Sequence, residues 1–234
     1  MNSLFKKVGI LLLGLVLTCG AGSVQAQVKK GSQMFKIVVF GDSLSAGYQV
    51  PKNQSFAAQL QGRLFKTGLN NVIVINHSRS GETTAGGLRR LPAVLEKENP
   101  NGLILELGIN DVLRGLSVTE VQNNLSKMIE LCQKKGVSVL LVGMKAPPYA
   151  GIMYQQRFDK MYSNLAKKYK LLLYPFFMKG LIEMENGAPQ TKGNYMLGDN
   201  LHPNVQGISL MVQNIMPYIS EFLKKNKINP PRWR

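Results

Sequence analysis

The feature that most constrains this chain is a repeated alternation of short apolar runs with longer amphipathic segments. The run FKIVVF, from Phe35 to Phe40, is rich in β-branched residues and is followed by Gly41, which is typical of a buried strand that ends in a tight turn. Between such runs, apolar side chains recur with helical spacing. We predict strands at residues 35–40, 72–76, 103–107, 137–142 and 171–174, and helices at 55–66, 84–97, 118–135, 157–170 and 205–224.

Strands that are apolar along their whole length, and that are separated by helices, indicate a sheet covered on both faces. The predicted fold is therefore α/β, with three layers (α/β/α, flavodoxin-like) and a mostly parallel five-stranded sheet. No internal repeat, low-complexity tract or linker interrupts residues 27–234, so we expect them to form a single domain.

The first 26 residues have the pattern of a secretory signal peptide. Two lysines precede the apolar run Val8–Thr18, and small residues lead to Val24–Ala26. The apolar run is far shorter than the roughly 20 residues that a membrane-spanning helix needs. We predict cleavage after Ala26 and a periplasmic or secreted protein. Lipid attachment at Cys19 is the alternative, although Thr18 stands where such processing signals have a smaller residue.

Charge and cysteine content restrict the function classes. The chain has 29 Lys and Arg against 13 Asp and Glu, which gives a formal charge of +16, while 44% apolar residues exclude a disordered chain. Two cysteines exclude a disulfide scaffold and a paired zinc motif. A non-catalytic protein that binds nucleic acid or anionic surfaces is one alternative, but the basic residues are scattered and no aromatic-interleaved binding module is present.

The loops that follow the predicted strands are the places to look for chemistry, because ligands of open α/β sheets bind at the carboxyl ends of the strands. The first strand leads into Gly41-Asp42-Ser43, where a serine can expose its hydroxyl and point its own N–H at a carbonyl oxygen. The pattern is not Gly-x-Ser-x-Gly, which disfavours an α/β-hydrolase. Gly-Asp-Ser is also an ordinary turn or helix-cap sequence.

Three later segments supply partners for such a serine. Gly81 and Asn110 follow the second and third strands and can donate hydrogen bonds to an oxyanion, although both also suit ordinary turns. His202 can act as a base, and Asp199, three residues earlier, can orient its ring. The other histidine, His77, has no carboxylate at comparable spacing, and we interpret it as structural.

Together these four blocks resemble the SGNH, or GDSL, hydrolases. Further similarity, to a bacterial periplasmic branch of that family with acyl thioesterase, arylesterase and lysophospholipase activities, lies in Gly41–Tyr48, Gly87–Pro92, Leu105–Gly115 and Pro175–Met178. The resemblance implies a Ser43, Asp199 and His202 triad and an oxyanion hole made by Ser43, Gly81 and Asn110. It implies no metal and no organic cofactor. Ile109 departs from the pattern, because that branch has a second glycine there, and Arg79 replaces a small or aliphatic residue.

The expected reaction is hydrolysis of carboxylic ester or thioester bonds through an acyl-enzyme on Ser43. Apolar residues near the strand ends suit a fatty-acyl or aryl substrate, and Ile109, Leu113, Pro147 and Tyr149 are the candidate contacts. A carbohydrate acetylesterase on the same scaffold is the alternative. We expect a monomer that makes transient contact with anionic membrane surfaces and binds no nucleic acid.

Overall fold

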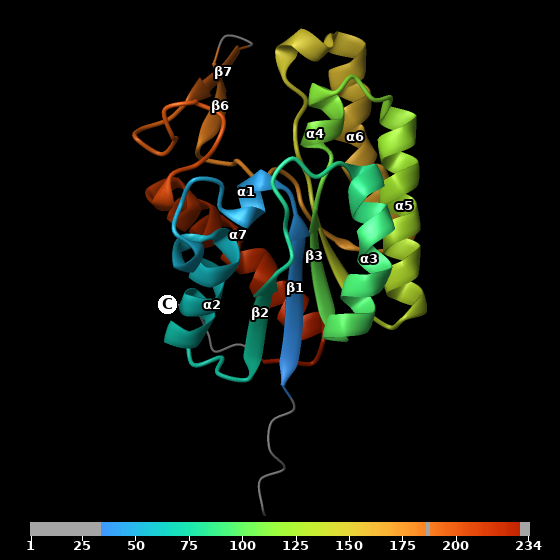
Figure 1. Cartoon of the computed structure of the whole chain (residues 1–234), viewed down its shortest axis with the longest axis vertical. Coiled ribbons are helices and arrows are strands. Elements are labelled where there is room, and N and C mark those ends of the chain that lie inside the picture. The colour runs from blue at the N-terminus through green and yellow to red at the C-terminus, as the bar shows by residue number, and fades with distance from the viewer. Residues whose placement is uncertain (1–33, 186–187, 230–234) are drawn as a thin grey trace, which may run out of the picture. The chain divides into compact units, whose positions relative to one another are not determined.

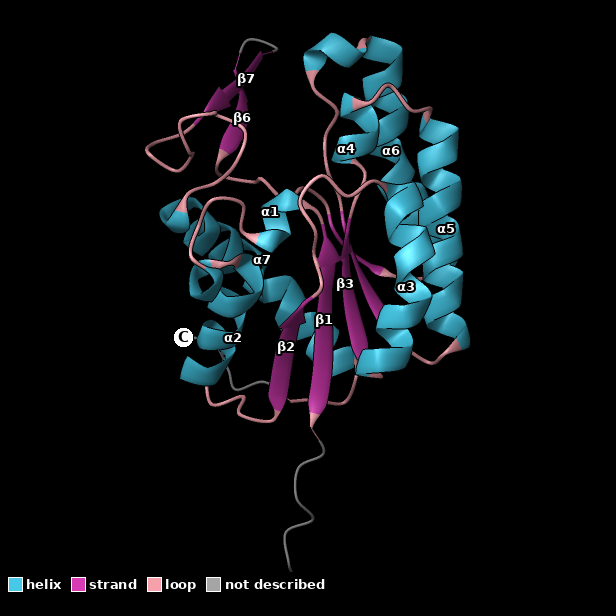
Figure 2. Ribbon diagram, viewed as in Figure 1, coloured by secondary structure: helices cyan, strands magenta, loops and turns pink. Residues whose placement is uncertain are grey.

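The strand β1 (Phe35–Gly41) lies inside the main sheet, and Ile37, Val38, Val39 and Phe40 on it are fully buried. The structure, a computed structural model, describes residues 34–185 and 188–229. Its main sheet has the order β2-β1-β3-β4-β5, and every neighbouring pair is parallel (Figure 2). The other strands of this sheet are β2 (Val72–Asn76), β3 (Gly102–Glu106), β4 (Ser138–Val142) and β5 (Leu172–Tyr174).

Helices cover both faces of the sheet, as Figure 1 shows. One layer contains α2 and α7, and the other contains α3, α5 and α6. Side chains cap several of these helices, since Ser55, Thr83, Ser117 and Asn204 each accept hydrogen bonds from backbone N–H groups of the first turn. The helices are α1 (Ser43–Ala46), α2 (Phe56–Lys66), α3 (Thr84–Glu98), α4 (Ile109–Leu113), α5 (Val118–Lys134), α6 (Ile152–Tyr169) and α7 (Val205–Lys225).

The strand order determines where a site can form. The chain runs outward from β1 to β2, then crosses to β3 on the other side of β1. In doubly wound sheets of this order, ligands bind at the carboxyl ends of β1 and β3, where the direction of winding reverses. The short helices α1 and α4 begin at those two ends (Figure 1).

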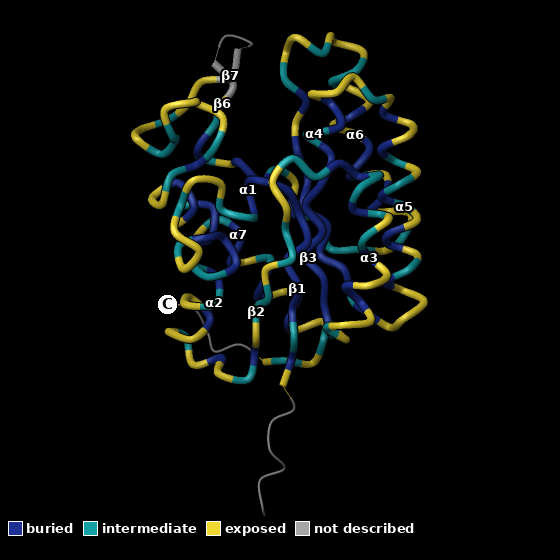
Figure 3. Tube along the Cα trace, viewed as in Figure 1, coloured by how far each residue is buried: buried dark blue, intermediate teal, exposed yellow. Residues whose placement is uncertain are grey.

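The core fills the space between the sheet and the two helical layers. Figure 3 shows β1 and β3 dark blue along most of their length, whereas β2 at the sheet edge is partly exposed, and other exposed segments lie in the loops and on the outer sides of the helices. Cys132, on α5, is buried in this core and is a free thiol. Truncating a fully buried side chain such as Ile104 to alanine removes about 2–5 kcal/mol of stability.

The predicted three-layer α/β/α fold is confirmed, and its elements end within one residue of the predicted bounds except at α6. The predicted helix start at residue 157 is wrong, because α6 already begins at Ile152, and a 3-10 helix occupies Pro148–Ala150 before it. Ile152 and Met153 are exposed, so the start of α6 lacks the amphipathic pattern that identifies a helix.

Three further elements were not predicted. The helices α1 and α4 are too short to show a helical period. The antiparallel hairpin of β6 (Ile182–Glu185) and β7 (Ala188–Thr191) stands apart from the main sheet. Its signal in the sequence was the dipeptide Asn186-Gly187 between the two strands, a frequent hairpin turn.

The proposed signal peptide, residues 1–26, lies outside the described residues, as do residues 230–234 of the carboxy-terminal tail. Across residues 34–185 and 188–229, none of the helices is long and apolar enough to cross a membrane.

Candidate active site

The turn after β1 presents Ser43 at the carboxyl edge of the sheet. Asp42 is the N-cap of α1, and its side chain accepts a hydrogen bond from the Leu44 N–H at 3.0 Å. A side chain at Gly41 would collide with Ser45, since its Cβ would lie 2.6 Å from Ser45 Oγ. Ser43 is therefore the first residue of a tightly held helical turn, with 9% of its surface exposed.

The loop before α7 places a histidine and an aspartate next to Ser43. His202 Nε2 lies 2.9 Å from Ser43 Oγ, and His202 Nδ1 lies 2.7 Å from Asp199 Oδ2. An ionised carboxylate only accepts hydrogen bonds, so the ring proton belongs on Nδ1. Nε2 is then free to accept the hydroxyl proton of Ser43. The three predicted residues thus form one continuous hydrogen-bonded chain.

Asp199 is held as a carboxylate by its surroundings. Its Oδ1 accepts the backbone N–H groups of Leu201 at 2.9 Å and His202 at 3.0 Å. Burial disfavours the charged form, but these backbone hydrogen bonds and the His202 ring outweigh it and lower the pKa of Asp199 to about 2. The loop itself is fixed by a hydrogen bond from the Leu197 N–H to the His202 carbonyl, at 2.7 Å. Asp199 is therefore ionised at neutral pH.

Tyr48 is a member of the site that the sequence analysis did not identify. Its ring packs on the His202 ring with 4.3 Å between centroids and an interplanar angle of 37°. The signal was present in the sequence, because Tyr48 ends the motif Gly41–Tyr48 that carried the family resemblance. Tyr48 packs on the face of the imidazole ring, whereas Asp199 bonds to its edge at Nδ1. The two contacts therefore restrict the ring in different directions.

The two other predicted oxyanion donors follow β2 and β3. Asn110 lies in the first turn of α4, and its Nδ2 donates to Asp42 Oδ2 at 3.1 Å, next to Ser43 in the chain. Gly81 has a φ of 74°, a left-handed conformation that favours glycine. Its carbonyl accepts a hydrogen bond from Arg114 at 3.0 Å, which ties this turn to the loop after α4.

Three buried acidic residues lie at the same edge of the sheet, and the sequence analysis gave them no role. Asp42, Glu106 and Asp111 are each fully buried. Asp111 accepts from the Thr84 N–H at 2.9 Å and the Thr84 hydroxyl at 2.6 Å, so it connects the first turns of α3 and α4. Within the described part of the chain, no group of three or more His, Cys, Asp or Glu side chains is arranged to hold a metal ion.

The predicted substrate contacts lie on loops and helix ends near this edge, but they differ in exposure. Ile109 is half-buried against the core, and Pro147 is also half-buried. Leu113 and Tyr149 are exposed, with relative accessibilities of 54% and 73%. Tyr154, on α6, connects that helix to the segment after α4, because its hydroxyl donates to the Leu116 carbonyl at 2.7 Å.

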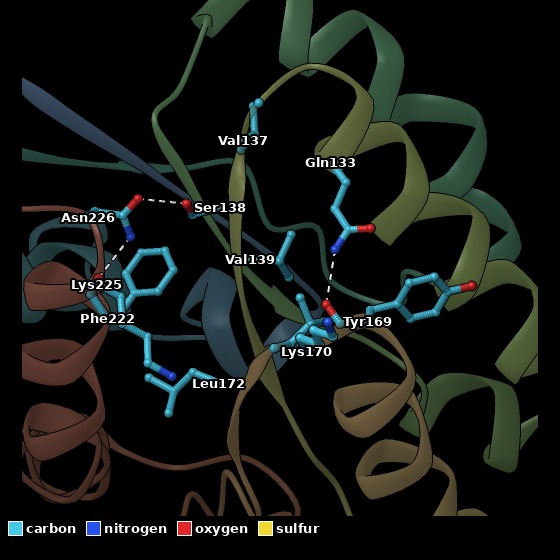
Figure 4. A pocket seen from close by; sticks show the side chains of 12 residues that line it. Gln133, Val137, Ser138, Val139, Tyr169, Lys170, Leu172, Phe222, Lys225 and Asn226 are labelled. Carbon is cyan, nitrogen blue, oxygen red and sulfur yellow. Dashed lines mark hydrogen bonds between the residues drawn. The ribbon is translucent and has the colours of Figure 1, made fainter.

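A separate hollow of about 440 Å³ lies near the beginnings of β4 and β5, at the opposite edge of the sheet from Ser43 (Figure 4). Its walls are held by internal hydrogen bonds, from Ser138 Oγ to Asn226 Oδ1 at 2.6 Å and from Gln133 to the Tyr169 carbonyl at 3.1 Å. None of the predicted site residues lines it, so it is not part of the candidate active site.

Comparison with known proteins shows which family this chain resembles. A sequence model of the GDSL-like lipase/acylhydrolase family matches residues 39–209. An arylesterase of Vibrio mimicus is 37% identical over 220 residues, which are 94% of this chain and 98% of that protein. Thioesterase 1/protease 1/lysophospholipase L1 of Escherichia coli K12 is 30% identical over 189 residues, 81% of each chain. The crystal structure of the esterase EstA from Pseudoalteromonas sp., inhibited by monoethylphosphonate, superposes with a TM-score of 0.73 at 31% identity, covering 81% of this chain and 98% of EstA.

Proposed function

Because the chain belongs to the GDSL-like lipase/acylhydrolase family and is an ester hydrolase, we propose that Ser43, His202 and Asp199 are its catalytic triad. The observation that carries this proposal is the hydrogen-bonded chain from Ser43 Oγ through both ring nitrogens of His202 to Asp199. Family membership also favours an enzyme over the non-catalytic basic protein considered above.

In the proposed mechanism, His202 Nε2 takes the proton of Ser43 while Ser43 Oγ attacks the carbonyl carbon of an ester or thioester. Asp199 stabilises the imidazolium that forms. The Ser43 N–H, the Gly81 N–H and the Asn110 amide donate to the oxyanion. His202 then gives its proton to the leaving alcohol or thiol, which departs from the acyl-enzyme. In the second half of the reaction, His202 takes a proton from water as the water attacks the acyl carbonyl carbon. His202 returns this proton to Ser43 Oγ as the acid is released.

Covalent labelling by a fluorophosphonate tests this assignment directly, because the reagent reacts with an activated serine. We expect labelling of the folded protein and loss of labelling in Ser43→Ala. Ser78→Ala is a matched control, since its hydroxyl makes only a 3.4 Å contact with a backbone carbonyl, and it should label normally. Folded wild-type protein that does not label, or labelled Ser43→Ala, would contradict the proposal.

For the substrate, we propose a fatty-acyl or aryl ester whose acyl chain lies along Ile109, Leu113, Pro147 and Tyr149. Each buried methylene contributes about 0.8 kcal/mol, so kcat/KM for a series of p-nitrophenyl esters should rise about fourfold per methylene until the apolar surface ends. The variant Leu113→Ser should flatten this rise. Acetyl esters that outperform all longer esters would favour a short-acyl esterase such as a carbohydrate acetylesterase.

For localisation, we propose export with cleavage after Ala26. Acyl-CoA is an intracellular metabolite, so lysophospholipids or other envelope esters are then the natural substrates. Amino-terminal sequencing of the protein recovered from the periplasm or medium should begin at Gln27. Recovery of the full-length chain only from the cytoplasm would contradict both export and the envelope substrate.

We propose that the active-site edge contacts anionic membrane surfaces through an apolar tip made by Tyr149, Ile152 and Met153. These side chains are 73%, 70% and 68% exposed, and Figure 3 shows the exposed segment above α4 and α6. Apolar side chains at the tip would enter the lipid interface, while the net positive charge attracts anionic headgroups.

Vesicle sedimentation and turnover of lysolipid in vesicles test this contact. Ile152→Ser/Met153→Ser should weaken binding to anionic vesicles while it leaves hydrolysis of a soluble short-chain ester unchanged. Phe65→Ser is the matched control, because Phe65 is 64% exposed on α2 and lies outside the tip. Equal activity on anionic and zwitterionic vesicles at low salt, with no response to added salt, would contradict a role for the charge.

A further inference from the structure

A buried pair of carboxyl groups lies directly behind the serine turn. Asp42 follows β1, and Glu106 is the last residue of β3, in register with Gly41. Both carboxyl groups are fully buried. Glu106 Oε2 lies 2.5 Å from Ser45 Oγ and accepts the Asp42 backbone N–H at 3.3 Å. Glu106 thus contacts the residue before Ser43 and the residue two positions after it.

The two carboxyl groups differ in their hydrogen-bond partners. Each oxygen of Asp42 has a donor, because Oδ1 accepts the Leu44 N–H and Oδ2 accepts the Asn110 amide. Glu106 Oε1 is buried and has no hydrogen-bond partner among the described residues. A buried ionised carboxylate with an unsatisfied oxygen is costly, whereas the carbonyl oxygen of a neutral acid loses much less. One proton held by these two carboxyl groups therefore belongs on Glu106, whose Oε2 makes the 2.5 Å contact with Ser45 Oγ.

The surrounding charges agree with that placement. Burial raises the pKa of Glu106 well above its usual range, and the negative charge of Asp42 raises it further. Burial also raises the pKa of Asp42, to about 7, against the lowering effect of its two donors, so Asp42 is the ionised member of the pair from about neutral pH upward. The other titratable groups that face the pair are Asp111 on α4 and Tyr162 on α6, whose hydroxyl donates to the Leu107 carbonyl at 3.0 Å. No Lys or Arg among the described residues forms an ion pair with Glu106.

We propose that Glu106 is a positioning residue, held as a neutral carboxylic acid so that Asp42 remains ionised and orients the Asn110 amide. An ionised Asp42 can only accept, so it selects the NH₂ side of the amide and not its oxygen. One N–H then bonds to Asp42, and the second N–H is left to donate to the substrate oxyanion. If the proton moved to Asp42, its hydroxyl could donate to Asn110 Oδ1, and the flipped amide would turn its NH₂ group away from the oxyanion. The inference rests on the proposed oxyanion role of Asn110.

Infrared spectroscopy tests the protonation state without relying on activity. The difference spectrum between wild type and Glu106→Gln at neutral pH should contain the carbonyl band of a protonated carboxyl group, lost in the variant. Glu106→Gln has the same shape and cannot ionise, so its kcat should remain close to that of wild type. A difference spectrum with only carboxylate bands would overturn the proposal.

A double-mutant cycle tests the positioning role. Glu106→Leu removes the polar contacts and should lower kcat by between about tenfold and 10³-fold, with little change in KM. The upper limit is the loss expected when one oxyanion donor is removed. If Glu106 acts through Asn110, Glu106→Leu should cost almost nothing further in an Asn110→Ala background. Additive losses would overturn the inference while leaving the proposed triad intact. If Asn110→Ala alone left kcat unchanged, the oxyanion role itself would fail. Should Glu106→Leu not fold, the infrared comparison with Glu106→Gln still decides the protonation state.

Discussion

The two histidines of this chain each pair with a carboxylate, in two regions with different consequences. His202 Nδ1 lies 2.7 Å from Asp199 in the loop before α7, and His77 Nε2 lies 2.9 Å from Glu98 at the end of α3. Both pairs are partly exposed, and both carboxyl groups have a lowered pKa. By these criteria either pair could serve as a catalytic dyad.

The difference lies in what each pair contacts next. The second ring nitrogen of His202 faces the Ser43 hydroxyl at 2.9 Å, whereas the hydrogen bonds of the described residues bring no hydroxyl to the His77 ring. Glu98 instead lies near basic groups, with Lys97 at 3.9 Å and Lys36 donating to the Glu98 backbone carbonyl. A histidine–carboxylate pair can act as a catalytic base only where the fold brings a nucleophile to it.

Replacing each histidine in turn is the most severe test of the difference between the two pairs. His202→Ala should lower kcat on a soluble p-nitrophenyl ester by a factor on the order of 10⁴ to 10⁶, because the triad members act as a unit. His77→Ala should leave kcat near the wild-type value and lower the free energy of unfolding by about 1 kcal/mol, the value of one hydrogen bond. Steady-state kinetics and urea unfolding measure the two effects. A large loss of activity in His77→Ala would show that the effect on activity is not confined to the His202 pair.

Replacing each carboxylate by its amide tests the same difference without a change in side-chain size. Asp199→Asn should lower kcat about 10⁴-fold, because an amide favours the wrong tautomer of His202 and cannot stabilise the imidazolium. Glu98→Gln makes the same chemical change at the other pair and should have no comparable effect on kcat. The two variants are assayed with the same ester at neutral pH, after circular dichroism has shown that both fold. Equal losses in both would show that the change acts through stability.

The proposed oxyanion donor Asn110 contacts Asp42, next to Ser43, which predicts a smaller but specific loss of activity there. Asn110→Ala should cost about 2.7 to 4 kcal/mol of transition-state stabilisation, seen as a decrease in kcat with KM little changed. Asn124→Ala is a matched control, because the Asn124 amide donates to Thr84 Oγ1 in the part of the core behind the site. A change confined to KM would show that Asn110 binds substrate in the ground state instead.

The sequence allowed the sheet and the five long helices to be predicted, and it drew attention to Ser43, Asp199 and His202, which the structure brings into one hydrogen-bonded chain, because these signals are local. Apolar runs, helical periods and short motifs such as Gly41-Asp42-Ser43 are each contained in one segment. The start of α6 could not be found in this way, since Ile152 and Met153 turn apolar side chains to the solvent. The helices α1 and α4 hold Ser43 and Asn110, yet each is too short to show a period.

The buried acids could not be predicted for a different reason. In the sequence, Glu106 is a single acidic residue at the end of an apolar strand, and nothing local shows that its carboxyl group meets Ser45. That contact depends on the parallel register of β1 and β3, which places Gly41 beside Glu106. Tyr48 is similar, because its contact with His202 exists only after the loop before α7 has folded back over the first turn. Contacts between distant segments are the part that required the structure.

The smallest predicted effect is on the pH dependence of stability, and it is expected at both histidine–carboxylate pairs. The pKa of Asp199 is lowered from 3.8 to about 2 in the folded protein. A carboxyl group with a lowered pKa stabilises the fold above its unfolded-state pKa, and this stability is lost as pH falls through the folded-state value. The relevant window is therefore from about pH 4 to about pH 2. Since about a third of the Asp199 side chain is exposed, solvent screening leaves a contribution of roughly 1 kcal/mol.

Urea unfolding across that window should show wild type losing roughly 1 kcal/mol more than Asp199→Asn. Glu98 has a lowered pKa, chiefly from its hydrogen bond with His77, so Glu98→Gln should reduce the acid sensitivity in the same direction. Only Asp199→Asn should also lose activity at neutral pH. If instead Asp199→Asn kept the full acid dependence of wild type, its carboxylate would not be held by the hydrogen bonds described above. Because both pairs lower a carboxyl pKa but only one faces a serine, titration behaviour does not distinguish the two histidines, whereas the contact of His202 with Ser43 does.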